Sequence, residues 1–174
     1  IGRPMAAQIL AAGYPLAVHD LVEEAAAELI EKGATWRESP GAVAAASDVV
    51  FTCLPGPPEM ESVVVGASGI AEGIASGALY VDSTTNSPDL VRRAHAALAE
   101  RGVGMLDAPV SGGMEGARTR DLTMLVGGSD DVFARAKPVL DAVAKTVMHV
   151  GGIGAGSICK ITHNAAAFGR SLAM

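Results

Sequence analysis

The chain has 174 residues, of which 49% are hydrophobic and only 3% aromatic, so it can bury one good core or slightly more than one domain. Its 13 Lys and Arg residues are outnumbered by 19 Asp and Glu residues, which gives a formal net charge of -6. No basic run is present that could follow a phosphate backbone, so we expect no nucleic-acid partner.

Cysteine usage and hydropathy exclude further classes of protein. Cys53 and Cys159 are far apart and lack metal-ligand spacing, which favours a reducing compartment and a chain that binds no metal. No apolar stretch approaches the roughly 18 residues that a membrane-spanning helix needs, and the first residues do not form a signal peptide. We therefore expect a soluble, cytoplasmic protein with no membrane partner.

The first half of the chain alternates between helix and strand patterns. A natural chain opens with Met, whereas Ile1 lies inside what reads as a loop, so we expect the fold to be truncated at its first strand. A proline in the first turn and the stop at Gly13 indicate the first helix. The expected helices cover 4–12, 22–32 and 40–46, and the expected strands cover 16–20 and 49–54, the last stopped by Pro55.

The second half continues the alternation. The expected strands cover 78–82, 104–107, 122–126 and 147–150, and the expected helices cover 88–101, 130–144 after a cap at Ser129, and 157–174. This spacing predicts an α/β fold with a doubly wound, mostly parallel sheet covered on both faces. We divide the chain into a sheet domain over 1–152 and a linker with the start of a long helix over 153–174.

The most informative motifs are Lys160 with Asn164, and the upstream segment Ser111-Gly112-Gly113. A lysine and an amide at spacing i, i+4 project from one face of a helix. Ser-Gly-Gly at a strand end offers a hydroxyl and unobstructed backbone N–H groups to a small anion. Together these motifs predict a site for proton transfer on an alcohol that carries a carboxylate, at the carboxyl edge of the sheet.

Gly2 and Asp20 have the spacing of a dinucleotide site. Gly2 precedes a helix, and Asp20 follows 18 residues later at a strand end. They fit the third glycine and the ribose-binding acid of a dinucleotide fold, whose first two glycines would lie upstream of Ile1. A glycine before a helix and an acid after a strand are also ordinary features, so a purely structural interpretation has equal standing.

Other motifs likewise keep two interpretations. The glycine run, residues 151–156, follows the last strand, so we interpret it as a flexible connection rather than a second phosphate loop. Gly127-Gly128 is most simply a turn. Thr84 and Thr85 either lead into the next helix or face a bound nicotinamide. A lone lysine such as Lys160 is usually a solvated helix residue. A catalytic role is favoured because Asn164 lies one turn further on and the Ser-Gly-Gly segment lies upstream.

The order of these motifs resembles the β-hydroxyacid dehydrogenase family. The family includes 3-hydroxyisobutyrate dehydrogenase and tartronate semialdehyde reductase, and 6-phosphogluconate dehydrogenase is a more distant relative. The match spans the whole chain and implies a Rossmann-like dinucleotide-binding domain over 1–152. The matching segments are Gly-x-Pro-Met from Gly2, the acid Asp20, Leu54-Pro55, Asp82-Ser-Thr-Thr85, Asp107-Ala-Pro-Val-Ser-Gly-Gly113, Gly116-Ala117 and Gly-x-Gly-x-x-x-Lys160.

The resemblance also implies roles for individual residues. Lys160 is the catalytic acid/base by this resemblance, and the substrate is held by Ser111, Gly112, Gly113 and Asn164. The dinucleotide is lined by Gly2, Asp20, Leu54, Pro55 and Thr85. We expect NAD rather than NADP, because the Asp20 carboxylate accepts from ribose hydroxyls and repels an additional phosphate.

The chain departs from the family pattern in three respects. The first strand and first two glycines are absent, and so is the helical C-terminal domain that forms most of the family's dimer, so we expect a homodimer or homotetramer for the full-length protein. His163 matches the Lys-x-x-His-Asn pattern of the 6-phosphogluconate branch, with a surface or core histidine as the alternative. Asp107-Ala-Pro-Val points instead to 3-hydroxyisobutyrate-like members.

These features predict an NAD-dependent oxidoreductase that interconverts a small β-hydroxyacid and its semialdehyde. One alternative is a decarboxylating dehydrogenase of the 6-phosphogluconate type. Another is a noncatalytic dinucleotide-binding module. Ser111, Lys160 and Asn164 argue against the last alternative, because a binding module has no need of all three.

Overall fold

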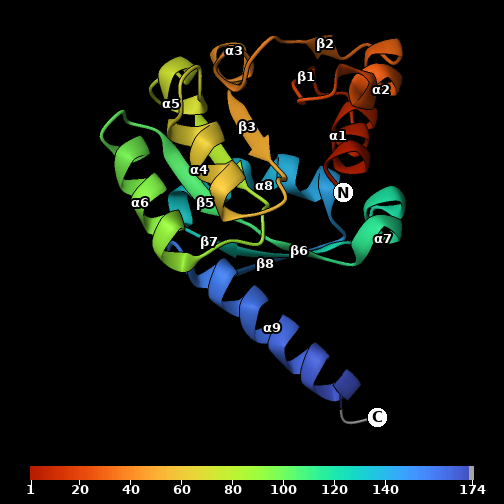
Figure 1. Cartoon of the computed structure of the whole chain (residues 1–174), viewed down its shortest axis with the longest axis vertical. Coiled ribbons are helices and arrows are strands. Elements are labelled where there is room, and N and C mark those ends of the chain that lie inside the picture. The colour runs from red at the N-terminus through yellow and green to blue at the C-terminus, as the bar shows by residue number, and fades with distance from the viewer. Residues whose placement is uncertain (173–174) are drawn as a thin grey trace.

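The computed structural model describes residues 1–172, which form a layered α/β fold (Figure 1). The helices are α1 (Gly2–Ala11), the 3-10 helix η1 (Glu23–Ala26), α2 (Ala27–Glu31), α3 (Pro40–Ala45), α4 (Pro57–Val65), α5 (Ile70–Gly73), α6 (Pro88–Ala99), α7 (Gly113–Thr119), α8 (Asp130–Val143) and α9 (Ala155–Leu172). The strands are β1 (Ala17–Val18), β2 (Thr35–Trp36), β3 (Val49–Thr52), β4 (Leu79–Asp82), β5 (Gly104–Asp107), β6 (Val110–Ser111), β7 (Thr123–Gly127) and β8 (Thr146–Gly151). None of the helices in the described part is long and apolar enough to cross a membrane.

The larger sheet has six strands within residues 1–172, in the order β3-β4-β5-β7-β6 with β8 paired to β7. Strands β3, β4 and β5 are parallel, with Val50, Tyr80 and Met105 side by side in register. Strand β7 is antiparallel to β5 and β6 but parallel to β8. A separate parallel pair is formed by β1 and β2. The predicted α/β fold with a mostly parallel sheet is confirmed.

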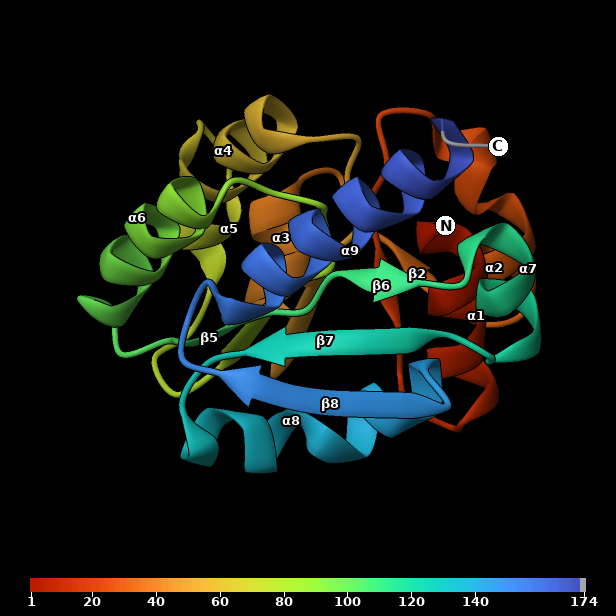
Figure 2. The ribbon, with the colours of Figure 1, turned by 90° about the horizontal axis from the view of Figure 1, so that it is seen from below.

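Helices cover both faces of this sheet, because successive side chains of a buried strand point to opposite faces. On one face, Val81 and Leu106 pack with Met5 of α1 and Leu140 of α8. On the other face, the strand residues Val50, Tyr80 and Met105 pack with Met60 and Val64 of α4 and with Leu90 and Val91 of α6. Figure 2 shows the β7–β8 pair with α8 on one side and α9 on the other.

Two helices begin at serine caps, and the predicted cap at Ser129 is confirmed by its hydrogen bond. The Ser39 hydroxyl accepts from the N–H of Ala42 at 3.1 Å, and α3 begins with Pro40. The Ser129 hydroxyl accepts from the N–H of Val132 at 3.4 Å at the start of α8. A serine oxygen replaces an intrahelical partner for one of the first N–H groups, which is why these residues mark helix starts in the sequence.

Several elements differ from the sequence-based expectation. The single helix predicted over 22–32 is divided into η1 and α2, and β2, β6, α4, α5 and α7 were not predicted. The segment around α4 and α5 reads as a loop because it is rich in glycine and proline. There a Cβ on Gly41 would lie 2.8 Å from the carbonyl oxygen of Gly69. The glycines therefore allow the backbones of α3 and α5 to pack closely, which is a tertiary effect rather than a turn signal.

Candidate functional site

Three polar side chains lie in register at the carboxyl ends of parallel strands. Thr52 of β3 pairs with Asp82 of β4, and Asp82 pairs with Asp107 of β5. All three are buried, and both carboxylates have no exposed surface. The expectation that the strand ends share one edge of the sheet is confirmed for these residues.

Asp82 organises the loop that follows β4. Its Oδ1 accepts from the Thr52 hydroxyl at 3.0 Å and from the N–H of Thr84 at 3.0 Å, and its Oδ2 accepts from Asn86 Nδ2 at 3.0 Å. The Thr52 hydroxyl also contacts the buried Tyr80 hydroxyl at 2.7 Å. Burial raises the pKa of Asp82, and the bonds from Asn86, Thr84 and Thr52 oppose the rise. The loop over 83–86 is therefore fixed from within the protein.

Replacing Thr52 with valine should destabilise the fold by about 1–3 kcal/mol, because the Tyr80 hydroxyl and Asp82 would each lose a buried partner. Urea unfolding followed by circular dichroism measures this loss. Thr35→Val is the matched control, since Thr35 lies exposed in β2. Equal unfolding free energies for the two variants would show that the buried network contributes nothing to stability.

Four of the predicted cofactor residues gather at the ends of β3 and β4. The hydroxyl of Thr84 accepts from the N–H of Leu54 at 3.1 Å, which joins the two loops, and Pro55 and Thr85 remain exposed beside them. Gly2 begins α1, and a Cβ at Gly2 would lie 3.4 Å from Cys53 Cβ. The hydroxyl of Thr84 is thus occupied by structure, whereas Thr85 is accessible to a ligand.

Asp20 lies apart from that group, after β1 in the smaller sheet. Its side chain is exposed, and its Oδ1 accepts from the N–H of Val22 at 3.1 Å. This bond fixes the carboxylate at the strand end.

The Ser111-Gly112-Gly113 segment joins a strand to a helix that was not expected. Ser111 pairs with Thr123 of β7, and Gly112 stands at the start of α7. Gly112 and Gly113 have φ angles of +129° and +64°, which favour glycine. A Cβ at Gly112 would lie 3.0 Å from Leu122 Cδ2, whereas a Cβ at Gly113 would meet nothing within 4 Å. The backbone at Gly113 is therefore open to an approaching group.

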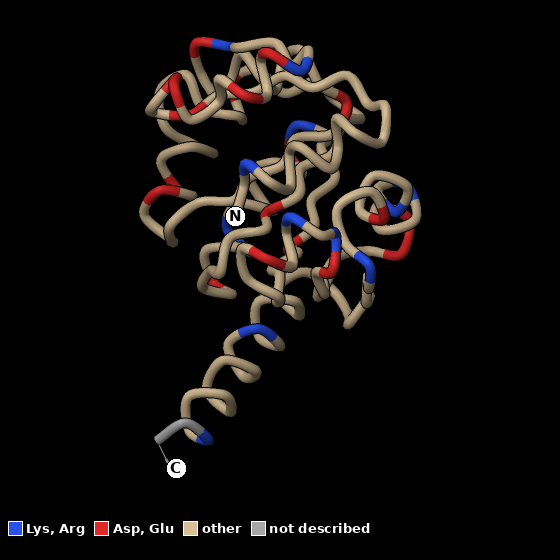
Figure 3. The backbone as a smooth tube through the Cα atoms, turned by 90° about the vertical axis from the view of Figure 1, so that its right-hand side faces the viewer, with Lys and Arg blue, Asp and Glu red and all other residues tan. Residues whose placement is uncertain are grey.

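Lys160 and Asn164 lie on one continuous helix, α9, as their spacing predicts. Both are half-buried, in contrast to His163, which is exposed. No acidic residue occurs in α9, and its two basic residues appear as blue bands along the projecting helix in Figure 3. Burial lowers the pKa of Lys160 below its ordinary value of 10.5. A lysine with a lowered pKa can exchange protons at lower pH than an exposed one.

Asp107 is a residue that the sequence interpretation missed. Its Oδ1 accepts from the N–H of Gly154 at 2.7 Å, and its Oδ2 accepts from the N–H of Ser157 at 2.7 Å. Burial raises the pKa of Asp107, and these two bonds oppose the rise. In the sequence, Asp107 is an acid at the end of an apolar strand and the first residue of the Asp-Ala-Pro-Val motif, and neither feature indicates its bonds to residues 154 and 157.

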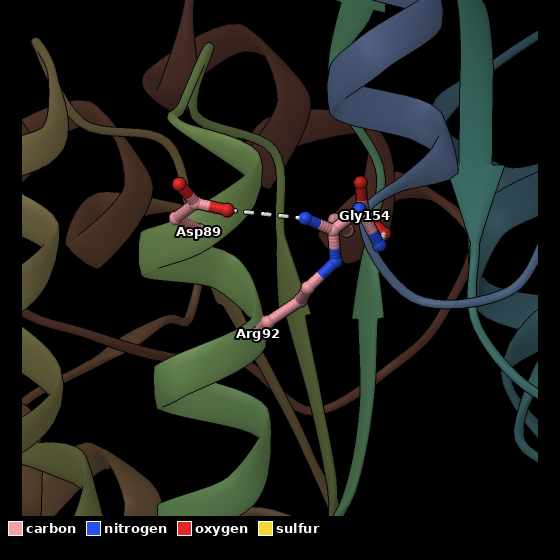
Figure 4. Close-up of polar contacts among 4 residues, drawn as sticks. Asp89, Arg92 and Gly154 are labelled. Carbon is pink, nitrogen blue, oxygen red and sulfur yellow. Dashed lines mark hydrogen bonds and ion pairs between the residues drawn. The ribbon is translucent and has the colours of Figure 1, made fainter.

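The second half of the glycine run, which was interpreted as a flexible connection, is held by contacts with other parts of the fold. Gly154 and Gly156 are buried, and Gly154 is bonded to Asp107. A Cβ on Gly154 would also lie 3.4 Å from Nε of Arg92, which pairs with Asp89 at 3.1 Å. Figure 4 shows Arg92 reaching from α6 toward Gly154. Gly154 and Gly156 are thus packed between other groups, whereas Gly151 and Gly152 are exposed.

Residues 1–151 match a family model described as the NAD binding domain of 6-phosphogluconate dehydrogenase. The chain belongs to this family. The match ends with the last residue of β8. Among the described residues, this NAD-binding domain holds no group of three or more His, Cys, Asp or Glu side chains suited to a metal ion.

Several similar proteins of known name are dehydrogenases, in agreement with the resemblance drawn from the sequence. An NAD-dependent L-serine dehydrogenase of Pseudomonas aeruginosa is 39% identical over 164 residues, which are 94% of this chain and 55% of the relative. The structure of Mycobacterium tuberculosis 3-hydroxyisobutyrate dehydrogenase with L-serine has a TM-score of 0.88 at 34% identity, covering 95% of this chain and 56% of that one.

A second solved structure, Psf3 in complex with NADP+ and 2-OPP, has a TM-score of 0.89 at 31% identity. It is matched over 95% of this chain and 58% of its own. The NAD-binding domain thus spans somewhat more than half the length of the relatives that it matches. The family binds NAD or NADP.

Proposed function

We propose that the whole protein containing this NAD-binding domain is an oxidoreductase that interconverts a small β-hydroxyacid and its semialdehyde with NAD. The observation that carries the proposal is the half-buried Lys160, whose pKa is lowered by burial and which lies one turn from Asn164. The helix that holds both residues is bonded to Asp107 at the same strand edge as the dinucleotide residues. We take 1–152 as the cofactor domain and 153–174 as the linker and start of the long helix.

The residues at the strand ends suit a dinucleotide. Gly2 leaves the start of the ten-residue helix α1 without a side chain, and Pro55 and Thr85 are exposed on loops held by Asp82 and Thr84. A helix N-terminus presents N–H groups that suit a pyrophosphate. Leu54, Pro55 and Thr85 would line the remainder of the dinucleotide.

The chemistry requires that an alcohol lose a hydride and a proton together. When bound, the nicotinamide supplies the acceptor for the hydride. Neutral Lys160 accepts the hydroxyl proton through its Nζ, and Asn164 orients the hydroxyl. The Ser111 hydroxyl and the N–H groups of Gly112 and Gly113 donate to the substrate carboxylate, which fixes the reacting carbon. In the reverse direction the protonated lysine returns the proton to the carbonyl oxygen.

This function can be tested by offering the whole protein a panel of small hydroxyacids. The absorbance of the reduced nicotinamide reports turnover. The panel includes 6-phosphogluconate, and the carbon dioxide released from it is measured. This measurement distinguishes a decarboxylating dehydrogenase from the proposed enzyme. Cofactor reduction with a small β-hydroxyacid and none with 6-phosphogluconate is the expected result. Tight dinucleotide binding without turnover on any substrate would instead support the noncatalytic module.

Cofactor choice gives a second prediction. NAD should bind more tightly than NADP, because the Asp20 carboxylate accepts from ribose hydroxyls and repels the additional phosphate. Asp20→Ala should weaken NAD binding and reduce the difference in affinity between NAD and NADP. Titration of both cofactors measures this, with Glu24→Ala as the control because it removes the same charge from the exposed part of η1. A native preference for NADP would refute the role of Asp20.

The pH dependence of turnover gives a third prediction. Because burial lowers the pKa of Lys160 below 10.5, its neutral form becomes available at lower pH than in an exposed lysine. Oxidation needs this neutral form, so kcat/KM should rise with pH through the lowered pKa and then level off. Reduction needs the protonated form and should fall over the same range. Rate profiles in both directions test this, and profiles without opposite slopes would contradict it.

A further inference from the structure

The anchor of α9 consists of one buried carboxylate and two backbone N–H groups. Each oxygen of Asp107 accepts one bond at 2.7 Å, from Gly154 on one side and from Ser157 on the other. Asp107 has no exposed surface, so its carboxylate depends on these protein donors rather than on bulk solvent. Hydrogen bonds to a buried charge are among the stronger ones in proteins, and their loss leaves the carboxylate unsatisfied.

Two glycines leave room for this anchor. A Cβ on Gly156 would lie 2.6 Å from the carbonyl oxygen of Asp107 and 3.1 Å from its Oδ2. A Cβ on Gly127, at the end of β7, would lie 2.8 Å from the backbone nitrogen of Gly156. The distances of 2.6 and 2.8 Å are shorter than those that real Cβ atoms show, so a side chain at either position would displace the first turn of α9. The close approach of α9 to β5 and β7 therefore depends on these glycines.

The anchored turn is directly connected to Lys160. Ser157 and Lys160 are three residues apart in α9, which is about 4.5 Å along the helix axis. Residues at this spacing lie on neighbouring parts of one helix face. Gly156 and Ser157 are buried and Lys160 and Asn164 are half-buried, so the face that carries the two site residues begins at the anchor.

We propose that Asp107 is a positioning residue for Lys160, because its carboxylate fixes the first turn of α9 and thereby the place and solvent exposure of the lysine. Its effect on catalysis rests on the proposed function. The chain supplies a matched comparison in Asp82, the buried acid next to Asp107 in register, whose bonds go to the cofactor-side loop instead. The two acids occupy equivalent places in adjacent strands and fix different halves of the site.

The first test needs no turnover. In the native chain, the amide protons of Gly154 and Ser157 should be shifted downfield in the NMR spectrum, as expected for N–H groups bonded to a carboxylate. In Asp107→Asn these downfield shifts should be lost. The pKa of Lys160, measured by NMR titration of the reductively methylated protein, should rise toward 10.5. In Asp82→Asn the pKa of Lys160 should remain as in the native chain, while NAD binding weakens.

Two results would overturn the proposal. One is ordinary amide shifts for Gly154 and Ser157 in the native chain, which requires no variant to fold. The other is a folded Asp107→Asn protein in which the pKa of Lys160 is unchanged. A pKa of Lys160 that moves equally in Asp107→Asn and Asp82→Asn would show a general structural effect and would also contradict the positioning role.

The catalytic consequence is tested separately in the whole protein. Asp107→Asn should lower kcat by about 10²-fold with little change in the KM for NAD, because a small displacement of a proton-transfer group is costly. If the whole protein proves inactive on every substrate, the proposed function fails but the NMR result stands. If the enzyme is active and Asp107→Asn retains its kcat, the positioning role fails and the function stands.

Discussion

Lys160→Ala in the whole protein should lower turnover by at least about 10²-fold, the lower range for a positioned proton-transfer group. NAD binding should change little, because the predicted dinucleotide residues lie at the start of α1 and after β1, β3 and β4 rather than on α9. Steady-state rates and a cofactor titration measure the two quantities. Equal losses in kcat and kcat/KM would identify an interaction made only in the transition state.

Arg170→Ala is the matched control for Lys160, since Arg170 is exposed on the same helix and carries the same charge. It should leave turnover close to the native value. Lys160→Arg adds a second comparison, because a guanidinium keeps the positive charge but does not deprotonate in proteins. Native-like turnover in Lys160→Ala would remove the lysine from the mechanism.

Gly113→Ala should raise the KM for the hydroxyacid by about 10- to 100-fold, which corresponds to one lost charge-assisted hydrogen bond. The added methyl group would enter open space at the place where the carboxylate is proposed to approach the backbone. Affinity for NAD should be nearly unchanged. Gly113 is a better test position than Gly112, where a side chain would also contact Leu122 and Asp121 within the protein.

Gly13→Ala controls for the backbone cost of this change. Gly13 follows α1, has a φ of +89° and would also place its Cβ in open space. Both substitutions should cost roughly 1–2 kcal/mol of stability, the usual penalty for a side chain in the left-handed region. Only Gly113→Ala should alter hydroxyacid kinetics. Native kinetics in a folded Gly113→Ala protein would show that the carboxylate binds elsewhere.

Helices and strands whose hydrophobic residues follow a clear local pattern could be predicted from the sequence. The strands β3, β4 and β5 are short apolar runs between turn signals, and α6 and α8 have long amphipathic patterns. Their parallel arrangement follows from the alternation and places the ends of β3, β4 and β5 at one edge. The pair β1–β2 has only two residues in each strand, so β2 gave no periodic signal.

The placement of candidate residues in the fold was predictable where the relevant geometry is local. Lys160 and Asn164 share a face because one unbroken helix contains both, and Ser129 could be identified as a cap from its neighbours. Asp107 could not be found in this way, since its partners are 47 and 50 residues further along the chain. The close packing of the glycine run depends on the same distant contacts, which explains why it read as a loose connection.

The long separation between Asp107 and its partners bears on the order in which the molecule folds. The contact with Ser157 closes a segment of 50 residues that includes β7, α8 and β8. Closing a flexible loop of that length costs about 3.5 kcal/mol of chain entropy plus a constant, so the contact becomes favourable only after β7 and β8 are in place. Helix α9 should accordingly become ordered late during folding and lose its order early during unfolding. Under mild denaturant, amide hydrogen exchange at Gly154 and Ser157 should proceed through a smaller opening free energy than exchange at Val81 and Leu106.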